Sequence, residues 1–171
     1  CPGDDLREPR TRCGSVVMVE IRKATHQDIE YICHLQRIEC NRQGSVGWLP
    51  RMAYEKEINA GGALFIGMEN DDEVGYIYAT HNNHGVTRIQ QLVVQDDARR
   101  LEIGTEFVDI VTRPTDWSLT LRCRSDLPSA AFWSDLGFQV TGVDNTPNKR
   151  KAGILRFNKI VGGLWVQGMG E

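Results

Sequence analysis

Residues 89–108 are the part of the chain whose residue types and order most directly suggest chemistry. An apolar strand pattern ends at Val94, a polar loop with Arg99 and Arg100 follows, and a helix pattern opens at Ile103. The unpaired N–H groups and the dipole of a helix N-terminus favour an anion, and two arginines would add positive charge beside it. We expect a pyrophosphate there, although an ordinary strand–helix turn with solvated arginines has the same pattern.

A second candidate segment, residues 125–138, places small residues before large aromatic ones. Three small residues at 129–131 precede Phe132 and Trp133 within a helix pattern. A helix with a small face can approach a ligand closely, and the indole of Trp133 would form a flat wall beside it. Packing of the aromatic residues in an ordinary core explains the same pattern, so both interpretations stay open.

Hydrophobic periodicity predicts that both segments belong to one mixed sheet flanked by helices. Apolar runs and alternation predict strands at 18–23, 63–68, 74–79, 86–94, 117–124, 138–143 and 154–161. Helical spacing, with Thr25 as N-cap and Pro114 as a stop, predicts helices at 25–41, 50–60, 103–111 and 128–136. The order β-α-α-β-β-β-α-β-α-β-β, with hairpins first and helix crossovers afterwards, predicts an α/β or α+β fold.

Length and composition favour one globular domain. The chain has 171 residues, of which 40% are hydrophobic, and the domain pattern spans residues 18–161. We expect residues 1–17 to be a disordered leader before Met18 as the natural start. Residues 162–171 contain four glycines, and we expect them to form a flexible tail.

Charge, hydropathy and cysteine usage limit which binding partners and which cellular compartment we expect for the protein. The formal net charge of −3 gives no electrostatic case for nucleic acid, and no apolar run approaches the roughly 20 residues of a membrane span. Five cysteines without CxxC spacing favour free thiols in a reducing cytosol and predict no metal site. We therefore expect a cytoplasmic protein without a nucleic-acid or membrane partner.

The first segment resembles the acetyl-CoA pyrophosphate loop of the GNAT superfamily of N-acetyltransferases. That loop has the pattern Q/R-x-x-G-x-G/A, in which Arg99 takes the Q/R position, Glu102 the first glycine and Gly104 the last position. The resemblance implies acetyl-CoA as the co-substrate, with its diphosphate at the start of the helix. The cofactor-binding residues that it implies are Leu92, Val93, Val94, Arg99, Arg100, Leu101, Glu102, Ile103, Gly104 and Thr105.

The second segment resembles the F/L-Y-x-x-x-G-F ending of the same family, and the resemblance extends over residues 18–161. Trp133 takes the usual tyrosine position, and Asp126 takes a position that is often asparagine. Together with Ser125, these are the residues to which the resemblance assigns catalysis. The implied fold is a single acyl-CoA N-acyltransferase domain with a mixed, mostly antiparallel central sheet.

The reaction that the resemblance implies is direct attack by a primary amine, on a small molecule or a protein, on the acetyl thioester. Backbone N–H groups near Val93 and Val94 would polarise the thioester carbonyl. An indole N–H cannot supply the proton that the family's tyrosine gives to the departing thiolate, so water, Cys123 or Ser125 would have to do so. Gln91 stands where some relatives place Glu and is not a base. The candidate bases, by residue type only, are Glu20, His81, His84 and Glu102.

Two other functions stay open at this point. Glu102 and Trp133 depart from the family pattern, which suggests a GNAT-like binding module that has lost catalysis. A GNAT toxin acting on charged tRNA would need a broad basic face, against which the net charge argues.

We interpret the basic run 149–151 as a solvated hairpin tip, although it could attract an acidic substrate or the CoA 3′-phosphate. Trp48 could contact a substrate or anchor packing, and we expect a monomer or homodimer.

Overall fold

The computed structural model describes residues 19–42, 47–98, 101–145 and 152–162, with only the backbone described at 41, 42 and 101. These residues form seven strands, four α-helices and two short 3-10 helices. The strands are β2 (Val19–Lys23), β3 (Ala63–Glu69), β4 (Asp72–His81), β5 (Val86–Val94), β6 (Ser118–Arg124), β7 (Gln139–Asp144) and β8 (Ile154–Ile160). The helices are η1 (His26–Asp28), α2 (Ile29–Arg42), α3 (Arg51–Asn59), η2 (Asp96–Ala98), α4 (Leu101–Val111) and α5 (Ser129–Asp135).

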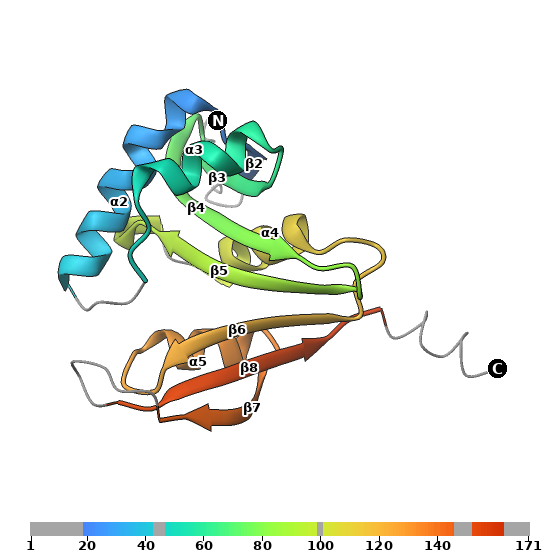
Figure 1. The fold of residues 1–171 in the computed structure, drawn as a ribbon. Helices are drawn as coiled ribbons and strands as arrows, with labels where there is room; N and C mark the ends of the chain where they lie inside the picture. The colour runs from blue at the N-terminus through green and yellow to red at the C-terminus, as the bar shows by residue number, and fades with distance from the viewer. Residues whose placement is uncertain (1–18, 43–46, 99–100, 146–151, 163–171) are drawn as a thin grey trace, which may run out of the picture.

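The strands form one mixed sheet in the order β2-β3-β4-β5-β6-β8-β7. Among the described strands, β5 and β6 are the parallel pair, and the other neighbours are antiparallel. The parallel pairing covers three residue pairs, from Val86–Ser118 to Arg88–Thr120. Beyond Arg88 the two strands diverge, so that β2 to β5 form one half of the sheet and β6, β8 and β7 the other (Figure 1).

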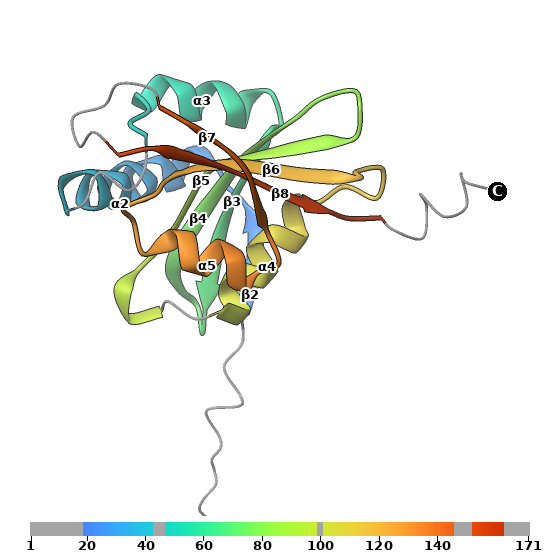
Figure 2. The same cartoon turned by 90° about the horizontal axis from the view of Figure 1, so that it is seen from below.

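Helices cover both faces of the sheet (Figure 2). One face packs under α2 and α3 in a cluster with Tyr76 of β4, and the opposite face packs under α4 and α5 in a cluster with Ile77. Adjacent residues of a strand point to opposite faces, which is why Tyr76 and Ile77 divide between the two cores. None of the described helices is long and apolar enough to cross a membrane.

A β-bulge in β5 exchanges the faces to which its side chains point. Tyr78 pairs with Gln91 but Ala79 pairs with Ile89, so Gln90 is the extra residue. Before the bulge, Ile89 faces the α4–α5 core, whereas after it the odd-numbered Gln91 faces α2 and α3. A polar side chain is thereby brought under the first two helices.

The predicted order of strands and helices and the mixed, mostly antiparallel sheet are confirmed. The Thr25 cap is also present, because the Thr25 backbone N–H donates to Asp28 at 2.7 Å. The start of α4 was predicted two residues too late: Asp96–Ala98 form a 3-10 turn, and α4 begins at Leu101. An exposed polar side chain such as Glu102 does not oppose a helical first turn, and an acidic one favours it. The leader and nearly all of the predicted tail lie outside the described residues.

Candidate functional site

The carboxyl ends of β5 and β6 bring the two candidate segments to one edge of the sheet. Because these strands are parallel, the chain leaves both at the same edge, toward α4 after β5 and toward α5 after β6. From Ile89 onward, no described residue of β6 pairs with β5. Strands that diverge next to two helix starts are a setting in which an extended ligand can bind between the halves of a sheet.

The start of α4 carries the predicted phosphate-binding residues. Glu102 and Thr105 are exposed in the first turns, whereas Ile103 is fully buried in the core. Ile103 can therefore reach a ligand through its backbone but not through its side chain. Arg99, Arg100 and the side chain of Leu101 lie outside the described residues.

Gly104 has a packing reason to be glycine. A Cβ built at this position would lie 2.8 Å from Cε1 of Phe132 and closer still to Cζ of the same ring. Helices α4 and α5 therefore touch at this point, and the aromatic ring occupies the space that a side chain would need. The glycine that the loop motif singled out sets the contact between the two helices.

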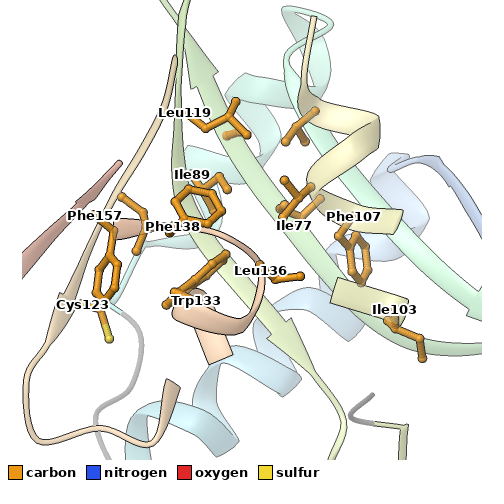
Figure 3. Packing of buried hydrophobic residues seen from close by; sticks show 14 of the residues in the cluster. Ile77, Ile89, Ile103, Phe107, Leu119, Cys123, Trp133, Leu136, Phe138 and Phe157 are labelled. Atoms are coloured by element: carbon orange, nitrogen blue, oxygen red, sulfur yellow. The ribbon is translucent and has the colours of Figure 1, made fainter. Parts of the chain in front are cut away.

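Trp133 lies inside the core at 7% exposure, between two other aromatic rings. Its ring makes an edge-to-face contact with Phe132 at a centroid distance of 5.1 Å. It makes another with Phe138 at 5.3 Å (Figure 3). Across the described part of the chain, its indole N–H has no hydrogen-bond partner. Buried donors are normally paired, so this N–H is an exception within a ring that packs as part of the core.

The turn between β6 and α5 holds the other residues assigned to catalysis. Ser125 and Asp126 are exposed, and the Asp126 carboxylate accepts a hydrogen bond from Arg124 at 2.8 Å. Cys123, just before them, is buried 3.3 Å from the Ser129 hydroxyl, and burial raises the pKa of its thiol. The thiol therefore stays protonated near neutral pH, so among these residues the hydroxyl of Ser125 and the thiol of Cys123 retain a proton to donate.

Two amides and two tyrosines form a buried polar cluster under α2 and α3. The amide of Gln91 donates to the Gln36 side-chain oxygen at 3.0 Å, and its own oxygen accepts from the hydroxyls of Tyr54 and Tyr76 at 2.6 and 3.1 Å. Burial raises the pKa of Tyr54 to about 12 and raises that of Tyr76 as well. All four groups are therefore uncharged and act through hydrogen bonds. We refer to these four residues as the amide–tyrosine cluster.

The amide–tyrosine cluster fastens the segment between α2 and α3 to β5. Gln36 exchanges two hydrogen bonds with the backbone of Leu49, at 2.7 and 2.9 Å, and Gln91 donates to the Gly47 carbonyl at 2.7 Å. Trp48 between them is 60% exposed, and Met52 is 74% exposed. Trp48 is therefore no packing anchor, which leaves substrate contact as the open interpretation. A polar residue at the otherwise apolar helical spacing of α2 was the sequence signal for this cluster.

A second buried polar network holds β5 and β6 together where they pair. The Asp116 carboxylate accepts from the Thr87 hydroxyl at 2.6 Å and from the Arg113 guanidinium at 2.8 Å. Burial opposes ionisation of Asp116, but the hydrogen bonds from Arg113 and Thr87 outweigh it and lower its pKa. His81 lies 2.7 Å from the Thr87 hydroxyl, and burial lowers its pKa. Hydrogen bonds therefore fix the end at which β5 and β6 pair, and the two strands diverge beyond it.

The residues named as possible bases by type alone do not meet at the carboxyl edge. His81 and His84 flank the turn before β5, at its opposite end, and Glu20 lies on β2, separated from β5 by β3 and β4. Within the described ranges, no group of three His, Cys, Asp or Glu side chains could hold a metal ion.

We compared the sequence with models of known protein families. A family model for the acetyltransferase (GNAT) domain matches residues 37–158. The chain belongs to the GNAT family. A search of curated protein sequences finds no match.

Solved GNAT-fold structures resemble the chain over most of their own length. Ard1 from Thermoplasma volcanium superposes with a TM-score of 0.70 at 17% identity, covering 84% of this chain and 97% of that chain. Salmonella typhimurium yncA, solved with acetyl-CoA, has a TM-score of 0.68 at 15% identity, covering 84% and 94%. Arabidopsis thaliana Naa50, in complex with the bisubstrate analogue CoA-Ac-MVNAL, has a TM-score of 0.64 at 18% identity, covering 82% and 97%. These likenesses establish the GNAT fold.

The residues of this GNAT domain fit coenzyme A at the carboxyl edge. From Ile89 onward, no described strand pairs with β5 on the side that faces β6. The part of coenzyme A that contains amide groups can hydrogen-bond to this edge as another strand would. The first turn of α4 offers backbone N–H groups suited to phosphate, whereas the buried Trp133 ring packs within the core. Among the described residues, the fit therefore rests on backbone groups.

Proposed function

We propose that this chain transfers an acetyl group from acetyl-CoA to a primary amine of a small molecule or a protein, in the cytoplasm. The observation that carries the proposal is the divergence of β5 and β6 after Arg88, with α4 starting at the open end of β5. The printed titles of two similar structures name acetyl-CoA and a CoA–peptide bisubstrate analogue as their ligands, which supports the same co-substrate here.

The proposed roles divide between backbone and side chains. Acetyl-CoA supplies an acetyl thioester, which an amine can attack directly. Backbone N–H groups at Val93 and Val94 polarise its carbonyl, and Arg99 and Arg100 pair with phosphate oxygens beside the first turn of α4. Trp133 shapes the site and offers a hydrogen bond but no acidic proton. Water, Ser125 or Cys123 therefore returns the proton to the thiolate.

The second candidate is a GNAT-like binding module without catalysis. Glu102 in the first turn of α4 puts a carboxylate where a phosphate would bind, and Trp133 replaces an ionisable hydroxyl. Replacement of Glu102 by glycine tests the repulsion on which this candidate rests, because it should tighten acetyl-CoA binding if the carboxylate repels the diphosphate. A weaker complex would mean that Glu102 has its own role in the site.

Thermal unfolding with and without acetyl-CoA tests the proposal. At about 100 times the dissociation constant, the ligand should add ~2.7 kcal/mol and raise Tm by roughly 5–10 °C. Joint replacement of Arg99 and Arg100 by alanine should abolish most of the shift, whereas Arg37→Gln, at an exposed position on α2, should retain it. A thiol assay for CoA release with a panel of amines then distinguishes the enzyme from the binding module. No shift at millimolar acetyl-CoA would refute the co-substrate.

A further inference from the structure

Four arginines lie on one uncovered face of the sheet, beside the point where β5 and β6 diverge. They are Arg88 of β5, Arg122 and Arg124 of β6, and Arg156 of β8. Helices α2 and α3 pack against β3, β4 and β5 on this side, and in Figure 1 both lie over the β2–β5 half of the sheet, away from β6, β8 and β7. We refer to these four residues as the arginine face.

Strand register shows that the arginine face is continuous. The Tyr78 hydroxyl donates to Glu57 of α3 at 3.1 Å, so the even-numbered residues of this part of β4 point toward that helix. Thr80 therefore shares the face, and it pairs with Arg88, which in turn pairs with Thr120. Alternation along β6 then places the even-numbered arginines of that strand on the same side, and Arg122 pairs directly with Arg156.

Aspartates neutralise part of the arginine face but not Arg88. Asp144 of β7 lies 3.1 Å from Arg122 and 3.3 Å from Arg156, and so relieves the repulsion between these two paired arginines. Arg124 pairs with Asp126 at 2.8 Å. Arg88 is exposed and, in the described part of the chain, has no hydrogen-bond or ion-pair partner. Arg88 is therefore the arginine of this face whose charge no described carboxylate balances.

An acceptor that approaches the divergence of β5 and β6 must come from this side. The opposite face is covered by α4 and α5, which meet at Gly104 and Phe132. On the open side, the amide–tyrosine cluster holds residues 47–49 against β5, so this segment and the arginine face border the same place. Trp48 is exposed on this segment, and Arg88 is exposed on β5.

We infer that the acceptor is an amine that also carries an oxyanion, a carboxylate or a phosphate, and that Arg88 binds this oxyanion. The inference rests on the proposed function. In the transfer, the acceptor nitrogen forms a bond to the acetyl carbonyl carbon while the carbon–sulfur bond breaks. The nitrogen loses a proton to water, and the CoA sulfur leaves with the electron pair and is protonated. Arg88 positions the acceptor and takes no part in these proton transfers.

The acceptor class is tested with matched amines in a CoA-release assay. The carboxylate arm compares glycyl-glutamate amide with glycyl-glutamine amide and glycyl-lysine amide, and the phosphate arm compares phosphoethanolamine with ethanolamine. We expect kcat/KM to favour the anionic member of at least one arm by about tenfold or more, and the preference to fall as ionic strength rises. The arm that shows the preference identifies the oxyanion. Preference for an uncharged or lysine acceptor, or acetylation of none of them, would overturn the inference.

Variants of Arg88 and Arg37 link the preference to one side chain. Arg88→Gln removes a charge at an exposed position and should lower the ratio of kcat/KM between anionic and neutral acceptors about tenfold, mainly through KM. Arg37→Gln removes an exposed charge from α2 and should leave the ratio unchanged. An equal ratio in both variants would overturn the assignment. If acetyl-CoA itself causes no Tm shift, the proposed function fails, and the inference falls with it.

Discussion

Replacing Gln91 with glutamate should destabilise the protein in a pH-dependent way. The Gln91 amide group donates hydrogen bonds to the Gly47 carbonyl at 2.7 Å and to the Gln36 side-chain oxygen at 3.0 Å, in a site that is almost fully buried. A carboxylate would turn an oxygen toward both acceptors, and none of the contacts described for this side chain comes from a cation. Burial without a cation raises the pKa of a carboxyl group.

The magnitude follows from that rise in pKa. An increase of about 2 to 3 units above the unfolded value of about 4.3 corresponds to a loss of about 3–4 kcal/mol in the free energy of unfolding. Because the folded pKa is the higher one, the loss accumulates as pH rises from about 4.3 to the raised value and stays constant above it. Below about pH 4.3 the protonated group can still donate one hydrogen bond, so a loss of about 1–2 kcal/mol remains.

Urea unfolding at pH 4, 6 and 8 measures this effect, with Gln90→Glu as the matched control. Gln90 is the exposed neighbour in the bulge, and its amide donates to the Thr80 hydroxyl at 3.0 Å. A carboxylate there can accept from the same hydroxyl, so we expect a change of less than about 0.5 kcal/mol at every pH. If both variants unfold alike at pH 8, the amide–tyrosine cluster does not anchor the segment at Gly47, and the reasoning is refuted.

Two further predictions concern packing and the buried ion pair. Gly104→Ala should lower the free energy of unfolding by about 1–3 kcal/mol in urea titrations despite the better helix propensity of alanine, because the new methyl group overlaps the Phe132 ring; an unchanged or higher stability would mean that the ring has room to move. Asp116→Asn should cost about 2–4 kcal/mol at pH 7, because it leaves the Arg113 charge without its partner. Since the folded pKa of Asp116 is lowered, its contribution is present above the unfolded value of about 3.9 and is lost as pH falls through the folded value. The difference between wild type and variant should therefore shrink in acid, and a difference that does not vary with pH would contradict the assignment.

The phosphate loop shows how far a local motif reaches. Its pattern led to Gly104 and to a helix start, both of which the structure contains, with the helix beginning two residues earlier. The resemblance assigned this glycine only to the last position of the loop pattern. Tertiary packing adds a physical reason, since the Phe132 ring of α5 fills the space beside it. Helix α4 precedes β6 in the chain and α5 follows it, so the spacing of residues within either segment does not predict this contact.

The sequence by itself determined the order and type of the elements, the bounds of β5 and the family. Hydrophobic alternation, helical spacing and stops such as Pro114 act over a few residues, so they can be read along the chain. Only the tertiary structure decided which faces the side chains share. The bulge at Gln90 turns Gln91 toward α2, and there it meets Gln36, 55 positions away. Strand register likewise brings Arg88 and Arg122 onto one face. Register and long-range packing depend on the whole sheet, because a shift of one residue reverses the face of every side chain that follows.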